Sequence, residues 1–295
     1  MDNKIIDGKL IAEQIKKEIA TEVAGMIDKG IPAPHLAAVI VGNDGASQTY
    51  VASKEKACKS VGMTSSVYRL SESTTEKELL DTVNFLNNDP EVDGYIIQLP
   101  LPKHIDENKV IQAIDPSKDV DGFTNVNAGR MQIGLPCFLP ATPYGIMQLI
   151  KRSGVETVGK NVVVLGRSNI VGTPVAILMS RKGIDSTVTM CHSRTKNIAE
   201  ISRTADILIV AIGKPGFVTA DMVKPGAVVI DVGIHRLEDA SSPKGYRITG
   251  DVDYENVYKV ASKITPVPGG VGPMTIVSLL QNTLDAAKGS FYSRD

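Results

Sequence analysis

The stretch Asn161-Val-Val-Val-Leu-Gly-Arg-Ser-Asn-Ile-Val-Gly172 decides the fold of this chain. Its apolar run predicts a buried parallel strand that stops at Gly166, a residue that permits a tight turn and a close approach. Thr173-Pro174 predicts a helix start, because Thr caps helices and Pro suits the first helical position. Such an element binds phosphate, since free N–H groups and the helix dipole favour an anion. Ser168 stands where the dinucleotide fingerprint has its second glycine, and the closing spacing is one residue longer, so the motif alone is a weak signal.

Composition is that of an ordinary globular protein. The 295 residues suffice for two domains, and 42% are hydrophobic while 22% are charged. The formal net charge of −1 argues against a surface for a polyanion. We therefore expect no nucleic-acid partner.

Cysteine and histidine usage excludes two further classes. The three cysteines, Cys58, Cys137 and Cys191, are widely spaced and favour a reduced, cytoplasmic setting over a disulfide framework. The four histidines share no metal-ligand spacing, so we expect no metal site. No apolar run approaches the length of a membrane span, and we expect no membrane partner.

The first half alternates helical and strand patterns, which predicts βαβ units, a parallel sheet and helices on both of its faces. We expect helices over 10–28, 47–61 (capped by Ser47) and 76–88, and strands over 36–41, 64–70 and 94–98. Residues 115–143 are rich in Pro, Gly, Asn and Asp, and we interpret them as a long functional connection between domains.

The second half predicts a compact, truncated Rossmann-like unit. A helical pattern over 144–152 precedes strands over 162–165, 186–191, 207–213 and 227–233. A last helical pattern covers 275–288, and the residues alone leave open whether it packs on the first domain.

The end of the second strand in this unit indicates which cofactor binds. A dinucleotide site normally has an acid there for the ribose 2′-hydroxyl, but Cys191-His-Ser-Arg-Thr195 contains no carboxylate. Ser193 with the cations Arg167 and Arg194 suits a 2′-phosphate, which favours NADP over NAD. The alternatives are that Arg167 is a solvated loop charge and that Arg194 faces water. Gly213-Lys-Pro-Gly216 is as consistent with an ordinary turn as with a segment near the cofactor.

Candidate chemistry lies in the first half. Tyr50 and Lys54 share a helix face, and Lys54 is a surface charge unless its surroundings lower its pKa. Gln98 ends a buried strand, either as a ligand of the site or as a satisfied amide. Asp119 and Asp121 fit a turn cap and a substrate contact equally well.

Five segments together go beyond general Rossmann logic. They are Tyr50-x-x-x-Lys54, Gln98-Leu-Pro-Leu-Pro102, Lys118-Asp-Val-Asp-Gly122, the glycine turn 166–172 and Pro266-Val-Pro-Gly-Gly-Val-Gly-Pro-Met-Thr275. In this order, and over essentially the whole chain, the set closely resembles the bifunctional methylenetetrahydrofolate dehydrogenase/methenyltetrahydrofolate cyclohydrolase family. Because the chain ends soon after the last segment, we expect the formate-ligase domain of trifunctional relatives to be absent.

The resemblance implies two reactions of one-carbon metabolism in one cleft, and a link to purine biosynthesis. Methylene-tetrahydrofolate is oxidised by NADP⁺ to the methenyl form, which water converts to formyl-tetrahydrofolate. Lys54 matches the family's general acid/base, Gln98 its orienting partner, Tyr50 a residue that stacks on or positions the folate, and Asp121 the pterin anchor. Gly269, Gly270 and Val271 are implied to let the backbone approach the folate.

The resemblance also implies the rest of the site and the architecture. Gly166, Arg167, Ser168, Ser193 and Ile234 would line the NADP site, with Arg167 and Ser193 on the 2′-phosphate. The implied α/β fold has a folate-binding domain over 1–140, a Rossmann-like NADP-binding domain over 141–273, and a C-terminal helix over 274–295 that returns to the first domain. Homodimers through the Rossmann unit are common in the family, so we expect one here.

Two alternatives stay open at this point. An NADP-dependent dehydrogenase of another small substrate, such as an amino acid, would share the layout but would not hydrolyse a methenyl group. A non-catalytic nucleotide-binding module would bind cofactor without turnover, and the presence of Lys54 and Asp121 argues against it.

Overall fold

The computed structural model describes residues 4–242 and 245–292, and it confirms an α/β fold with two parallel sheets. The chain divides into two compact units. The three-stranded unit comprises Glu13–Ala141 and residues from Ile276 onward, and the five-stranded unit comprises Thr142–Thr275 together with residues up to Ala12. The sequence prediction had placed the N-terminal residues in the first domain. They join the five-stranded unit because Ile5 bridges to Ile264, whose carbonyl accepts a 2.9 Å hydrogen bond from the Ile6 amide.

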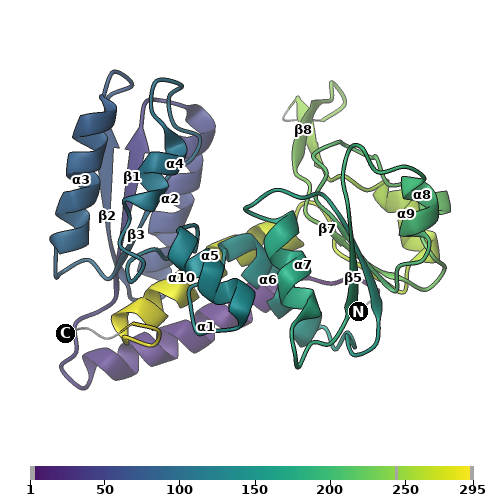
Figure 1. The fold of residues 1–295 in the computed structure, drawn as a ribbon, viewed down its shortest axis with the longest axis horizontal. Coiled ribbons are helices and arrows are strands. Elements are labelled where there is room, and N and C mark those ends of the chain that lie inside the picture. Colours follow the sequence, from purple (N-terminus) through teal and green to yellow (C-terminus); the bar gives the residue numbers. More distant parts are fainter. Residues whose placement is uncertain (1–3, 243–244, 293–295) are drawn as a thin grey trace. The chain divides into compact units, whose positions relative to one another are not determined.

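The three-stranded unit has β1 (His35–Val41) at the centre of its sheet, between β2 (Thr64–Leu70) and β3 (Gly94–Ile97), and all pairs are parallel (Figure 1). Ala37, Val39 and Val41 pack against α3 (Glu76–Asn88) and α4 (Glu107–Gln112). The alternate residues of β1 are buried as well, as expected for a strand covered on both faces. Helix α2 (Gly45–Ser60) runs along β1 and β2 and carries the candidate side chains to the sheet.

The five-stranded unit has the strand order β10-β7-β6-β4-β5, also parallel throughout. The strands are β4 (Asn161–Leu165), β5 (Thr187–Cys191), β6 (Ile207–Val210), β7 (Val228–Asp231) and β10 (Lys263–Ile264). An antiparallel hairpin follows β7 and consists of β8 (His235–Glu238) and β9 (Tyr246–Thr249). The helices of the unit are α6 (Ala141–Arg152), α7 (Gly172–Ser180), α8 (Ile198–Ser202) and α9 (Tyr254–Val260), with a short 3-10 turn at Ala220–Met222.

Helices α1 (Gly8–Ile27) and α10 (Val271–Ala287) extend into both units, and α6 begins at Ala141, the residue before a third unit boundary. The Asn282 amide of α10 donates to the carbonyls of Val120 (2.8 Å) and Leu139 (2.9 Å). The C-terminal helix therefore returns to the three-stranded unit, as the resemblance implied. Within the described ranges, none of the helices is both long and apolar enough to cross a membrane.

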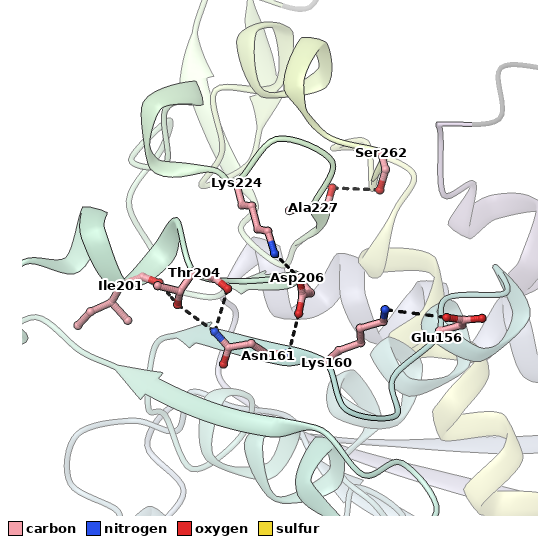
Figure 2. Close-up of polar contacts among 9 residues, drawn as sticks. All are labelled: Glu156, Lys160, Asn161, Ile201, Thr204, Asp206, Lys224, Ala227 and Ser262. Carbon is pink, nitrogen blue, oxygen red and sulfur yellow. Dashed lines mark hydrogen bonds and ion pairs between the residues drawn. The ribbon is translucent and has the colours of Figure 1, made fainter.

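Polar contacts within the protein connect the loops at the amino edge of the five-stranded sheet (Figure 2). The Asp206 carboxylate accepts from the Asn161 amide (2.9 Å) and pairs with Lys224 (2.6 Å), while the Asn161 side chain donates to Thr204. A cavity of about 400 Å³ lies at this edge. Ligands of open α/β sheets bind at the opposite, carboxyl ends of the strands, so we assign these contacts to stability.

Several elements differ from the sequence prediction. Residues 115–143 are not only a connection, because α5 (Asn125–Ile133) lies within them. Helix α4 and the β8–β9 hairpin were not predicted. The strand expected over 207–213 ends at Val210, since the amides of Ile212 and Gly213 donate to the Asp251 carboxylate instead of to a neighbouring strand. The cap of α2 is Asp44, not Ser47, whose amide donates to the Asp44 carboxylate (2.8 Å).

Candidate active site

Lys54 on α2 is held at the carboxyl end of β3. Its Nζ donates to Gln98 Oε1 at 3.2 Å. The Gln98 amide orientation follows from a second hydrogen bond, in which Nε2 donates to the Leu99 carbonyl (2.8 Å), and its backbone N–H donates to the Val39 carbonyl (2.8 Å). The sequence left open whether Gln98 belongs to the site or is only a satisfied amide at the end of a strand. In the structure its amide oxygen binds Lys54.

The surroundings of Lys54 change its acidity. Burial lowers the pKa of Lys54 below the ordinary value of a lysine, and the charge of Asp121 partly opposes this shift. Cys58, one turn along the helix, is fully buried, and burial raises the pKa of its thiol to about 12, so it stays neutral. A lysine with a lowered pKa exchanges protons more readily near neutrality. Lys54 is thus not an ordinary surface charge.

The two aspartates that the sequence could not separate have different environments. Asp119 is buried and accepts hydrogen bonds from the backbone amides of Phe123 (3.1 Å) and Thr124 (2.8 Å) and from the Asn127 side chain (2.9 Å). Within the described residues, the Asp121 carboxylate accepts no hydrogen bond. Burial raises the pKa of Asp121 to about 6, and the charge of Lys54 opposes the rise. Asp119 holds the turn, and Asp121 retains its acceptor capacity for a ligand.

Tyr50 lies one turn before Lys54 on α2, and 47% of its surface is exposed. An exposed ring one helical turn from Lys54 offers a flat apolar surface for an aromatic ligand. The three-stranded unit therefore holds Tyr50, Lys54, Gln98 and Asp121, and a shared role for these residues in one site stays a prediction.

Packing within the protein requires glycine at two positions of the turn that follows β4. Gly166 has φ +126°, and a Cβ there would overlap the Ala211 carbonyl at the end of β6. A Cβ on Gly172 would overlap the Gly166 carbonyl. These glycines are therefore needed first for backbone packing within the protein, where Gly166 contacts Ala211 and Gly172 contacts Gly166. The result is a compact turn at the start of α7.

The start of α7 differs from the prediction. The helix begins at Gly172, its N-cap is Val171, and Thr173 does not cap it. The side chain that binds the free amides at this helix start is Ser168. Its hydroxyl accepts a hydrogen bond from the Val171 amide (3.1 Å) and a longer one from the Gly172 amide (3.4 Å). Pro174 is the third helical residue, where its missing N–H costs nothing because first-turn amides have no partner within the helix.

The remaining predicted cofactor residues follow the carboxyl ends of β4, β5 and β7. Arg167 in the glycine turn and Ser193 after β5 are exposed, and so is Arg194. Ile234 follows β7 with 57% of its surface exposed. These positions offer a cation, a hydroxyl and an apolar surface along the carboxyl edge of the sheet.

Gly269, Gly270 and Val271 lie at the start of α10, within the five-stranded unit. Gly269 has φ +111°. A Cβ on Gly270 would come within 2.6 Å of the Pro266 carbonyl, and a Cβ on Gly8 would overlap the Gly270 carbonyl. Packing within the chain therefore already requires glycine at position 270, and folate contact by this segment stays a prediction.

Three residues at the carboxyl edge were not singled out by the sequence analysis. Asp231 and Asp251 are buried, and His235 Nε2 lies 2.6 Å from Asp251 Oδ1. The sequence does contain one sign of this group, because Asp231 is a carboxylate at the end of the otherwise apolar strand Val228–Asp231. Over the described part of the chain, no group of three or more His, Cys, Asp or Glu side chains is arranged to hold a metal ion.

Comparisons with known proteins agree with this arrangement. Residues 6–121 match the family model of the tetrahydrofolate dehydrogenase/cyclohydrolase catalytic domain, and residues 140–291 match that of its NAD(P)-binding domain. A bifunctional protein FolD from Porphyromonas gingivalis is 59% identical over 290 residues, which is 98% of each chain. These matches do not favour a dehydrogenase of an unrelated small substrate.

Solved structures give the same result. The bifunctional FolD methylenetetrahydrofolate dehydrogenase/cyclohydrolase from Campylobacter jejuni is 46% identical, with a TM-score of 0.92 over 97% of this chain and 99% of that one. The methylenetetrahydrofolate dehydrogenase-cyclohydrolase (FolD) from Trypanosoma brucei, solved with NADP cofactor and an inhibitor, is 41% identical, with a TM-score of 0.92 over 98% of both chains. With both family models matched in order along its length, the chain belongs to the tetrahydrofolate dehydrogenase/cyclohydrolase family.

Proposed function

We propose that this chain oxidises 5,10-methylenetetrahydrofolate with NADP⁺ and hydrolyses the resulting 5,10-methenyltetrahydrofolate to 10-formyltetrahydrofolate. Family membership supports both activities. The observation that carries the proposal is the pairing of Lys54 with Gln98 beside the unsatisfied Asp121, because this set combines a proton-exchanging amine with an acceptor for a cationic or amide-like substrate edge.

NADP fits the carboxyl edge of the five-stranded sheet. The compact turn built on Gly166 and Gly172 leads into the N-terminus of α7, where N–H groups and the helix dipole favour a pyrophosphate. Arg167 and Ser193 are exposed at positions suited to the 2′-phosphate, and the segment after β5 has no carboxylate to repel it. The relative from Trypanosoma brucei, which was solved with NADP, supports the choice of cofactor.

The first reaction requires mainly positioning. When bound, NADP⁺ accepts a hydride from the methylene carbon of the folate. The chain binds and orients the substrate: Asp121 accepts N–H bonds from the aminopyrimidine edge of the pterin, and the exposed ring of Tyr50 packs on the folate. Gly269, Gly270 and Val271 are proposed to contribute backbone contacts to the folate.

The second reaction requires proton transfer. Lys54, with its lowered pKa, accepts a proton from the water that adds to the methenyl carbon and returns it to the ring nitrogen as that C–N bond breaks. The remaining hydroxyl proton of the adduct is released to solvent as the formyl C=O forms. Gln98 Oε1 keeps Nζ in place during both transfers. This makes Lys54 a catalytic residue and Gln98 its positioning partner.

The decisive experiment supplies methylenetetrahydrofolate with NADP⁺ or NAD⁺ and follows reduced cofactor and formyl product in the same reaction. We expect NADPH to form faster than NADH, and the formyl product to appear faster than the methenyl form hydrolyses without protein. Cofactor reduction with only spontaneous hydrolysis would contradict the cyclohydrolase assignment. Cofactor binding with no reduction would favour the non-catalytic module.

We further propose a homodimer formed through the five-stranded unit and a cytoplasmic location. The edge strand β5 exposes Thr187, Thr189 and Met190, which leaves its outer side available to a second copy. Cys58, Cys137 and Cys191 are buried and widely spaced, a pattern that favours a reducing compartment over a disulfide framework. Light scattering at several protein concentrations tests the dimer, and a Thr189→Arg variant should shift the protein toward monomer.

A further inference from the structure

The predicted cofactor residues mark two ends of the carboxyl edge of the five-stranded sheet. Ser193 follows β5 and Ile234 follows β7, and β4 and β6 lie between these strands. Three strand spacings of about 4.8 Å separate the two ends by roughly 14 Å. A dinucleotide lies across such an edge. Because Ser193 is at the proposed 2′-phosphate end, Ile234 is at the other end, where the nicotinamide is expected.

Buried carboxylates hold the backbone on both sides of this end. Asp231 Oδ1 accepts from the amides of Gly233 (3.0 Å) and Asp251 (2.9 Å), and its Oδ2 accepts from the Val252 amide (3.0 Å). Its own amide donates to Thr265 Oγ1 (2.8 Å). Asp231 thus connects the residue before Ile234 to the segment that follows the β8–β9 hairpin.

Asp251 makes the second set of connections. Its Oδ2 accepts from the amides of Ile212 (2.8 Å) and Gly213 (2.9 Å), which form the turn after β6. Its Oδ1 accepts from His235 Nε2 at 2.6 Å. The turn after β6 and the residue after Ile234 are therefore fixed by one fully buried carboxylate.

Two glycines make this arrangement possible. A Cβ on Gly233 would overlap the Asp251 carboxylate, and a Cβ on Gly250 would overlap the Asp231 carboxylate. Placing two buried carboxylates together is unfavourable, and burial raises the pKa of Asp231 to about 6, with the charge of Asp251 adding to the rise. Such a cost is expected where the surrounding structure serves to hold a functional segment.

We propose that Asp231, Asp251 and His235 form a carboxylate latch that positions Ile234 and the turn after β6 for the nicotinamide end of the cofactor. The inference rests on the proposed function, since it takes this edge as the NADP site. The three are positioning residues and act through Gly233, Ile234 and Gly213. The latch lies wholly within the five-stranded unit, whereas Lys54 belongs to the three-stranded unit, so we expect the latch to leave proton transfer at Lys54 unchanged.

The test compares His235→Phe, which removes the donor to Asp251, with His235→Gln, which keeps an N–H donor at a similar distance from the backbone. Glu238→Gln, on the same strand and exposed, is the matched control. Each variant is titrated directly with NADP⁺ and with NAD⁺. Cyclohydrolase activity is then measured on methenyltetrahydrofolate without any cofactor. The KM and kcat of the dehydrogenase reaction are measured with methylenetetrahydrofolate and NADP⁺.

His235→Phe should weaken NADP⁺ and NAD⁺ binding by the same factor, about tenfold for a lost charge-assisted hydrogen bond, because the nicotinamide end is common to both. His235→Gln should restore most of the affinity, and cyclohydrolase activity should stay within twofold of the native protein in both. Unchanged cofactor affinity in His235→Phe overturns the proposal, and so does an equal loss of both activities, which indicates a general folding defect. The binding titration also separates this proposal from the proposed function, since it is informative even if the native protein turns over no folate.

Discussion

The carboxyl edges of the two sheets differ in the groups that they offer to a ligand. At the three-stranded sheet, the candidate catalytic and binding groups are partly buried side chains. Lys54 donates a hydrogen bond to Gln98, and the charge of Asp121 acts on Lys54. At the five-stranded sheet, the turn at Gly166 and Gly172 is defined by its backbone, and the polar side chains Arg167 and Ser193 are exposed. Burial tunes acidity, whereas a compact backbone turn presents N–H groups without any titration. The first edge is suited to proton transfer and the second to binding a charged cofactor.

The sharpest test of this contrast is Lys54→Met, which keeps the length of the side chain and removes the proton-exchanging amine. We expect cyclohydrolase activity to fall by about 10²–10⁴-fold, the usual contribution of a general acid/base. NADP⁺ binding should be unchanged. Lys56→Met is the control, since Lys56 is exposed on the same helix. Enzymatic hydrolysis at the native rate in Lys54→Met would remove the difference between the two edges.

Gly166→Ala tests whether the second edge depends on its backbone. The new Cβ would overlap the Ala211 carbonyl at a residue with φ +126°, so the turn must shift. Overpacking and backbone strain together predict a loss of about 3 kcal/mol in the free energy of unfolding, measured by denaturant titration, and a loss of NADP⁺ affinity.

Gly129→Ala is the control for this change, because Gly129 lies in α5 with open space around its Cα. It should stabilise the protein by up to about 1 kcal/mol through helix propensity. If Gly166→Ala were equally harmless, the turn would not be constrained by its own backbone.

The pKa of Asp121 predicts a pH dependence that the Asp121→Asn variant isolates, because Asp231, whose pKa is also raised to about 6, is present in both the native protein and the variant. Its folded-state pKa of about 6 lies above its ordinary value of 3.8, so the neutral carboxyl is favoured in the folded protein. The associated stability is fully present below pH 4 and is lost as the pH rises through 6. Asp121→Asn does not titrate there. Relative to the native protein, it should therefore gain about 2 kcal/mol of unfolding free energy between pH 4 and pH 8, after allowance for partial exposure.

Denaturant titrations of both proteins across this pH range measure the difference. Asp206→Asn is a useful contrast, because the pKa of Asp206 is lowered, chiefly by its hydrogen bond from Lys224. Its carboxylate contributes stability that is present above its ordinary pKa of 3.8 and is lost at lower pH, so this variant should lose stability relative to the native protein as the pH rises to that value, with a constant difference above it. A constant difference between Asp121→Asn and the native protein at all pH values would mean that burial does not shift the acidity of Asp121.

The smallest expected effect concerns Arg167, because it is exposed and its interactions are screened by solvent. Arg167→Ala should weaken NADP⁺ binding about tenfold and leave NAD⁺ binding nearly unchanged, since only NADP⁺ carries the 2′-phosphate. Arg194→Ala, in the segment after β5, shows whether a second cation shares this contact. Equal losses for both cofactors in Arg167→Ala would remove Arg167 from 2′-phosphate recognition.

Much of the fold was predictable from local patterns. The strands at Val162–Leu165 and Thr64–Leu70 and the helix over Glu76–Asn88 were located correctly, because runs of β-branched residues and a regular helical period determine such elements locally. The short helix α5 and the β8–β9 hairpin were missed, since neither is long enough to show a clear period. The strand over 207–213 was predicted too long because a distant carboxylate, Asp251, takes the amides of Ile212 and Gly213.

The sequence by itself determined which chemical groups are available: the spacing of Tyr50 and Lys54, the absent acid after Cys191, and the glycines of the turn. Only the tertiary structure decided what each group does. Asp119 and Asp121 are equivalent in sequence, yet three hydrogen bonds tie the first to its own turn, and none from the described residues reaches the second. The physical reason is that burial, hydrogen bonding and acidity depend on residues that are distant along the chain and adjacent only after folding.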